Sequence, residues 1–249
     1  MERKDYFSSQ SKAYAAFRPT YPAGLYKFIF KHLQGRSCAW DCATGNGQVA
    51  RYLARHFENV YATDISQAQL EEAFRAKNIF YSVAPAEKTS FPAGQFDLIT
   101  VAQALHWFNL DQFYQEVRRT GKPGGLLAVW GYALLAVDAV VDDLFIDFYV
   151  NTTGPYWDEA RRLVENQYRD VPFPFERIPS PEFTLKVKWN VDQFCGYLNS
   201  WSAIHKYISM HGTNPVESFS ETLKSVWKPG VVKEVTFPIF LKLGRISTQ

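Results

Sequence analysis

A glycine-bearing turn preceded by an acid is the pattern in this chain best suited to binding a ligand. Residues 39–50 read AWDCATGNGQVA, so that Asp41 comes shortly before Gly45 and Gly47. Glycine lets the backbone approach a ligand closely, and the first turn of the helix expected next has N–H groups without helical partners. We therefore expect residues 39–50 to form a ligand-binding turn between a strand and a helix.

Two kinds of ligand have to be distinguished at this turn. Residues 45–50 also match the dinucleotide fingerprint, with alanine in its last place. In that fingerprint the first glycine directly follows an apolar strand, whereas here residues 41–44 intervene. An acid before the glycines suits a ligand with positive ammonium and sulfonium groups and would repel a pyrophosphate. Asp64, at the end of the next expected strand, can accept both ribose hydroxyls of either kind of ligand.

The chain resembles a known enzyme family from about residue 8 to residue 130. DCATGNG resembles the first motif of the class I S-adenosylmethionine-dependent methyltransferases, acid-x-G-x-G-x-G, with Ala43 in place of the first glycine. ATDIS resembles the second motif, APAEK the third, and VAQALHWF the motif after the fourth strand. The chain is most similar to the small-molecule group of this family, which includes the trans-aconitate methyltransferases.

The resemblance implies S-adenosylmethionine as the cofactor and a set of residues that bind it. These are Asp41, Ala43, Gly45 and Gly47 at the turn, Asp64 on the ribose, Ile65, Ala86 and Glu87 near the adenine, and Gln103, His106 and Trp107 near the methionine end. SKAYAAFRPTYP, residues 11–22, resembles an N-terminal lid that brings Tyr14 and Arg18 over the cofactor. The alternative for this segment is a surface arm with one aromatic anchor.

The chemistry expected of such a site is an in-line displacement at an activated methyl group, for which positioning is the main requirement. A hydroxyl or amine acceptor would need a base, and His106 is the candidate; a carboxylate acceptor needs none, and the ring would then only position it. The alternative is a histidine packed beside Trp107. Aromatic residues past Trp130 are candidates to line an acceptor pocket, although most are expected in the core. They are Tyr132, Tyr156, Trp157, Trp189 and Trp201.

The elements that must position these residues alternate between strand and helix, which predicts an α/β fold. Strands are expected at residues 37–42, 59–63, 79–83, 96–102 and 126–130. Residues 132–168 are expected to be helical, residues 171–181 a proline-rich loop, residues 183–189 a strand, residues 191–201 and 216–227 helices, and residues 231–246 a last strand. Pro238 is expected to interrupt that last strand or to place it near an edge.

The fold predicted from this order is a doubly wound, seven-stranded, mostly parallel sheet in one methyltransferase domain. Residues 1–36 would form the lid and first helix, and residues 37–130 the cofactor-binding core. Residues 131–230 would form a substrate-cap insertion containing one strand, and residues 231–249 would supply the last strand.

Composition and charge disfavour some classes of binding partner. The formal charge is +2 and no long basic run occurs, which disfavours nucleic acid. The longest apolar stretch, residues 126–137, is too short for a bilayer, and residues 1–8 do not resemble a signal peptide. Three cysteines without a CxxC motif fit a reducing cytoplasm. We expect a monomer or homodimer acting on a small molecule. The alternatives are a nicotinamide-dependent oxidoreductase and a catalytically inactive binding module.

Overall fold

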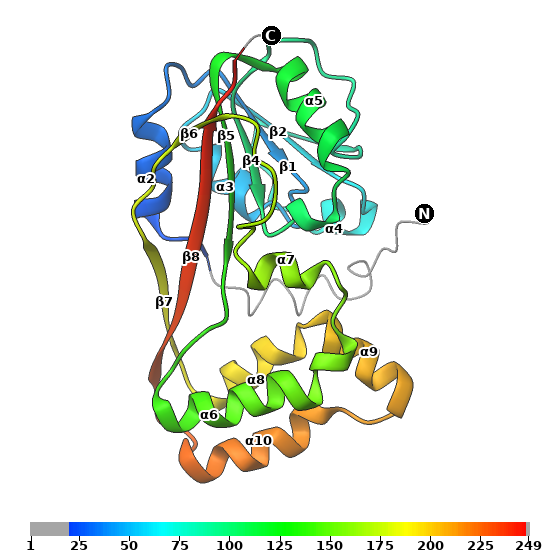
Figure 1. Ribbon diagram of the computed structural model, residues 1–249, viewed down its shortest axis with the longest axis vertical. Coiled ribbons are helices and arrows are strands. Elements are labelled where there is room, and N and C mark those ends of the chain that lie inside the picture. The colour runs from blue at the N-terminus through cyan, green and yellow to red at the C-terminus, as the bar shows by residue number, and fades with distance from the viewer. Residues whose placement is uncertain (1–19, 248–249) are drawn as a thin grey trace.

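The computed structural model describes residues 20–247, which form an eight-stranded sheet flanked by helices (Figure 1). The strand order is β3-β2-β1-β4-β5-β8-β6, and β7 also pairs with β8. β1 to β5 are parallel, whereas β8 runs antiparallel to β5, β6 and β7. The strands are β1 (Cys38–Cys42), β2 (Asn59–Asp64), β3 (Ile79–Val83), β4 (Phe96–Ala102), β5 (Gly121–Tyr132), β6 (Glu176–Ile178), β7 (Phe183–Trp189) and β8 (Lys233–Arg245). The predicted doubly wound α/β class is confirmed.

Helices cover both faces of the sheet because successive strand residues point to opposite sides. On one face α2 (Ala23–Lys31) and α3 (Gln48–Leu53) pack with Ala39 and Leu98; on the other α5 (Leu110–Thr120) packs with Trp40. α4 (Gln67–Glu71) and η2 (Leu105–Trp107) follow β2 and β4.

The remaining helices gather beyond one end of the sheet, at the bottom of Figure 1. They are α6 (Ala139–Asp147), η3 (Phe148–Thr152), η4 (Gly154–Tyr156), α8 (Val191–Asn199), α9 (Ser202–His211) and α10 (Pro215–Val226), and we call them the cap. Between the cap and the sheet lies α7 (Arg161–Glu165). Among residues 20–247 no helix combines the length and apolarity that crossing a membrane requires.

The region expected to be one helical stretch is broken into several pieces. β5 runs on to Tyr132, and Ala136 still bridges to Thr236 in β8. α6 begins only at Ala139, and its N-cap Asp138 accepts the N–H of Val141. Pro155 cannot continue a helix, and a short 3-10 turn there separates η3 from α7. α9 was not predicted.

The predicted insertion holds two strands where one was expected. The additional strand, β6, lies in the segment assigned to a proline-rich loop and pairs with the C-terminal end of β8. Gly244 allows this pairing, since a Cβ there would lie 2.6 Å from Phe173 and 2.7 Å from Phe175. The aromatic rings before β6 therefore pack against bare backbone, a tertiary effect that periodicity does not reveal.

Of the two expectations for Pro238, an interruption of β8 is wrong, because β8 continues through Pro238 in its pairing with β7. Pro238 is opposite Thr184 of β7, and its carbonyl accepts the N–H of Ala133, just beyond the last β5 pair, Tyr132 with Ile239. The N–H that proline lacks would point to the same side as that carbonyl. The donor that proline lacks would have returned a bond to Ala133, so the regular ladder with β5 ends at Pro238.

Candidate active site

The turn between β1 and α3 is held by Asp41, which is 1% exposed. Its Oδ1 accepts the hydroxyl of Thr100 at 2.8 Å, and its Oδ2 accepts the hydroxyl of Thr44 and the N–H of Ala50 at 3.0 Å. Ala50 lies in the first turn of α3, so this carboxylate satisfies one of the helix's unpaired donors. Burial raises the pKa of Asp41 to about 6, while the three hydrogen bonds oppose that rise.

Backbone conformation explains the glycines of the turn. Gly45 and Gly47 have φ of 55° and 77°, in the left-handed region. A Cβ on Gly47 would also lie 2.3 Å from the Tyr81 hydroxyl. Ala43 has φ of 54°, a conformation that costs an ordinary residue about 1–2 kcal/mol. Alanine in place of the motif's first glycine therefore strains the backbone.

Asp64 ends β2 beside this turn and is tied to it. Its Oδ2 accepts the N–H of Gly45 at 2.8 Å, and its Oδ1 accepts the N–H of Ser66 at 2.9 Å. Ser66 in turn caps α4. Ile65 is 48% exposed, as an adenine contact would require. Asp64 consequently has a structural role in addition to the predicted ribose contact.

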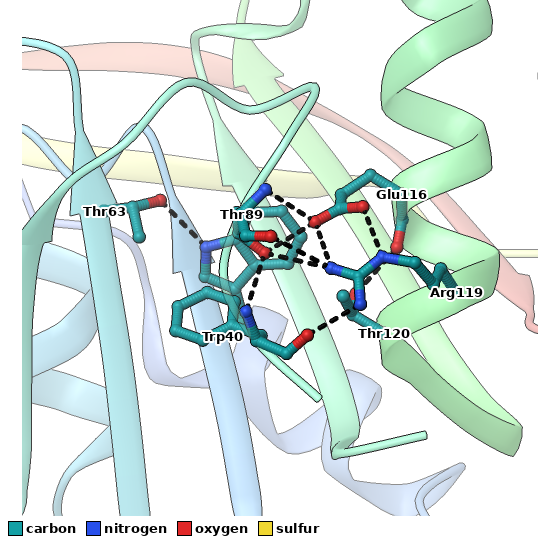
Figure 2. A network of polar contacts seen from close by, with 7 residues as sticks. Trp40, Thr63, Thr89, Glu116, Arg119 and Thr120 are labelled. Atoms are coloured by element: carbon teal, nitrogen blue, oxygen red, sulfur yellow. Dashed lines mark hydrogen bonds and ion pairs between the residues drawn. The ribbon is translucent and has the colours of Figure 1, made fainter. Parts of the chain in front are cut away.

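The loop that carries Ala86 and Glu87 is anchored to α5 by a polar network (Figure 2). Glu116 accepts the N–H of Thr89 at 2.7 Å and pairs with Arg119 at 2.6 Å. Arg119 also donates to the carbonyls of Phe91 and Thr89. Because Glu116 is held by Arg119 and Thr89, its pKa is lowered despite burial.

The two residues of this loop differ in their surroundings. Ala86 is buried in the core, and Glu87 accepts the N–H of Asn109, the cap of α5. Their predicted adenine contacts remain predictions.

Gln103 combines two features typical of functional residues. It has φ of 55°, a left-handed conformation that non-glycine residues adopt at a cost of order 1–3 kcal/mol. Its Nε2 donates to the carbonyl of Tyr132 at 3.4 Å, whereas its buried Oε1 has no hydrogen-bond partner. A native structure keeps such a strained and unsatisfied group for a reason.

A single pocket brings part of the predicted set together. Of the predicted residues it includes Asp41, Ala43, Gly45 and Gln103. Its further lining was not predicted as cofactor-binding: Tyr21, Thr44, Asn46, Gln48, Val49, Ala102 and Tyr132. Thr44, Asn46 and Gln48 were within reach of sequence reasoning, because they alternate with the motif glycines. Tyr132, one of the aromatic candidates, does reach the site.

The other predicted residues lie outside that lining. They are Gly47, Asp64, Ile65, Ala86, Glu87, His106 and Trp107. The predicted lid residues Tyr14 and Arg18 lie outside the described residues. Trp107 is 42% exposed.

His106 has an orienting partner that the sequence did not reveal. Its Nδ1 lies 2.8 Å from the hydroxyl of Tyr168, a fully buried residue 62 positions later. Tyr168 and Gln167 both have positive φ, so the chain is strained where it presents this hydroxyl. Nδ1 is the acceptor available to the buried hydroxyl proton, and we assign the imidazole as the neutral form with its proton on Nε2.

The charge state of His106 follows from its surroundings. Burial, with the positive charge of Arg161 nearby, lowers the pKa of His106 to about 3. The ring is therefore neutral at physiological pH and a weak base. The aromatic neighbour expected from the sequence is present as well, since the Trp107 ring centre lies 4.7 Å from that of His106.

Comparison with known proteins agrees with this geometry. Residues 40–129 match the family model described as a methyltransferase domain. The chain is 34% identical to a proposed methyltransferase of Dictyostelium discoideum, over 97% of this chain and 95% of that protein. It is 28% identical to methyltransferase cfoB of Aspergillus candidus, over 72% of this chain and 64% of the relative.

A solved structure extends the likeness to the whole fold. A proposed type II methyltransferase of Anaeromyxobacter dehalogenans superposes with a TM-score of 0.86 and 37% identity, covering 94% of this chain and 100% of that one. The family match includes the β1–α3 turn, and the relative from Dictyostelium spans nearly the full chain. On this combined ground the chain belongs to the class I S-adenosylmethionine-dependent methyltransferases.

Proposed function

We propose that the pocket beside the β1–α3 turn binds S-adenosylmethionine and that a small molecule accepts the methyl group. The observation that carries this proposal is the coupling of the turn to Asp64: the Gly45 N–H donates to Asp64 Oδ2. The carboxylate is thereby fixed beside a pocket lined by Asp41, Gly45 and Gln103. A ribose bound to Asp64 would leave the rest of the ligand along the glycine turn.

The chain offers suitable groups for each end of the cofactor. The side-chain amide of Gln103, whose Oε1 has no hydrogen-bond partner among the described residues, suits an ammonium group. The aromatic rings of Tyr21 and Tyr132 line the same pocket and suit a positive sulfur through cation–π attraction. When bound, S-adenosylmethionine supplies a methyl group already activated by its positive sulfur. The work left to the protein is positioning and exclusion of water.

We also propose that the N-terminal segment, residues 8–21, is a lid over the cofactor. Tyr21 lines the pocket at the end of the segment that resembles a lid, which supports closure of residues 8–21 over the cofactor. Hydrogen exchange of this segment should slow when S-adenosylhomocysteine binds. Identical exchange with and without ligand would leave it as a surface arm.

We also propose that the enzyme acts in the cytoplasm, as a monomer or homodimer, without binding nucleic acid. All three cysteines are free, and Cys42 and Cys195 are buried, as suits a reducing compartment. Size-exclusion chromatography with light scattering tests the oligomeric state. Gel-shift titration with single- and double-stranded nucleic acid tests whether the protein binds nucleic acid.

Calorimetry tests the cofactor site. S-adenosylhomocysteine should bind the wild type, and Asp64→Asn should weaken binding by about tenfold or more, since a charge-assisted hydrogen bond is worth about 1.5–3 kcal/mol. Asn is chosen over Ala because it keeps one of the two oxygens that accept backbone N–H groups of the turn. Glu71→Gln, an exposed acid in α4, is the matched control. Equal affinity in a folded Asp64→Asn variant would remove Asp64 from the site, and tighter binding of NADH would revive the oxidoreductase.

A further inference from the structure

Arg161 is a half-buried cation that forms no direct ion pair among residues 20–247, and Glu165 reaches it only through the shared Tyr149 hydroxyl. In residues 20–247 it makes no ion pair within 4.0 Å, whereas Lys206 and Lys233 each have an aspartate at 2.6 Å. The contacts of Arg161 are the face of Trp157, 4.7 Å from the guanidinium carbon, and the Tyr149 hydroxyl at 3.5 Å. That hydroxyl already donates to Glu165. The guanidinium therefore keeps most of its five N–H donors for another acceptor.

A second and a third donor lie in the same region. The buried Nε1 of Trp157, the indole against which Arg161 stacks, has no hydrogen-bond partner. The Nε2–H of His106, assigned through the bond from Tyr168, makes no hydrogen bond to another residue within the described part of the chain. Arg161 is close enough to both His106 and Tyr168 to lower their pKa values. No acidic group contributes to the shift in the pKa of His106.

The placement of these donors relates them to the proposed cofactor site. His106 lies on η2, three residues after the pocket residue Gln103. Arg161 begins α7, which packs against η2 and lies between the sheet and the cap (Figure 1). An acceptor bound here would lie between the cofactor-binding core and the cap.

We infer that Arg161 and His106 bind a carboxylate of the acceptor, which makes the substrate a small organic acid. Arg161 supplies the positive charge and a planar pair of donors that match a carboxylate. His106 supplies one neutral donor, and Tyr168 is the positioning residue that fixes its tautomer. This inference rests on the proposed function, because it assumes that the pocket beside Gln103 holds the cofactor. His106 is then a donor and not the base that a hydroxyl or amine acceptor would need.

Binding measurements separate this inference from the cofactor site. Protein saturated with S-adenosylhomocysteine is titrated calorimetrically with benzoate, succinate and citrate, and with the uncharged amides benzamide and succinamide. At least one acid should bind and its amide should bind at least about tenfold more weakly. Failure of S-adenosylhomocysteine itself to bind would defeat the proposed function instead.

Variants locate the bound acid. Arg161→Gln should weaken acid binding by about tenfold or more and leave the affinity for S-adenosylhomocysteine unchanged. Arg162→Gln is the matched control, because Arg162 is an exposed neighbour of the same charge. His106→Gln should weaken acid binding less than Arg161→Gln does. The inference is overturned if no acid binds, if an amide binds as well as its acid, or if Arg161→Gln binds like Arg162→Gln.

Discussion

The turn at residues 41–47 and the junction formed by His106, Arg161 and Tyr168 differ in how many of their polar groups already have protein partners. At the turn the carboxylates of Asp41 and Asp64 accept bonds from protein donors within 19 positions in sequence, apart from the Thr100 hydroxyl. At the junction the residues come together from 55 to 62 positions apart, counted from His106, and within residues 20–247 Arg161 makes no direct ion pair. The turn is complete before a ligand arrives, whereas the junction leaves donors for one. A site preformed by protein contacts, like the turn, suits a cofactor common to a family. A site with donors left for a ligand, like the junction, suits a substrate particular to one enzyme.

Gly47→Ala should produce the largest loss of stability, because it places a side chain within the rigid turn itself. The new Cβ would lie 2.3 Å from the Tyr81 hydroxyl, at φ of 77°. Left-handed strain and overpacking together should cost about 3 kcal/mol of unfolding free energy, measured by urea denaturation. Gly24→Ala is the control, since nothing lies within 4 Å of its Cβ in helix α2. Equal stability of the two variants would contradict the description of the turn.

Tyr168→Phe should have the next largest effect and act on the junction. It leaves Nδ1 of His106 without its donor, at a cost of about 1–3 kcal/mol. The proton on the imidazole can then move between its nitrogens, which ¹⁵N NMR of the ring detects. Tyr114→Phe loses a comparable bond, to the carbonyl of Pro172, without touching His106. An unchanged His106 spectrum in Tyr168→Phe would refute the assigned tautomer.

The pH dependence of stability distinguishes His106 from Asp41. The pKa of His106 is lowered to about 3, so unfolding takes up a proton below pH 6.5, and stability falls as the pH falls. The pKa of Asp41 is raised to about 6, so its contribution rises as the pH falls toward 4. Between pH 7 and pH 5 the wild type should lose about 2 kcal/mol relative to His106→Gln. Parallel stability curves for the two proteins would show that His106 is not buried in its neutral form.

Ala43→Gly should have the smallest effect, in the opposite direction to Gly47→Ala. Relief of left-handed strain, about 1–2 kcal/mol, is offset by the greater freedom of glycine in the unfolded chain, about 0.4–1 kcal/mol. We expect a gain of about 0.5 kcal/mol. Ala54→Gly, at the right-handed end of α3, should instead lose stability. A loss in both variants would mean that Ala43 contributes by packing.

The sequence predicted most of the fold and the rigid part of the site, and the two regions explain why. Asp41, Gly45 and Asp64 lie in short motifs whose spacing follows from strand ends and a helix start, so local sequence determines their placement. Tyr168 and Arg161 are positioned by the path of the chain after β5, with its broken helices and left-handed residues. Residue types alone could not indicate that Tyr168 would meet His106. The same tertiary dependence hid β6 and the continuation of β8 through Pro238.

Hydrogen exchange by mass spectrometry tests the division between the two regions most directly. S-adenosylhomocysteine should slow exchange in residues 43–50 and 64–67 and leave residues 161–168 nearly unchanged. Addition of the tightest-binding carboxylate to that complex should then slow exchange in residues 105–108 and 161–168. Protection of residues 161–168 by S-adenosylhomocysteine alone, with none at residues 43–50, would contradict the account.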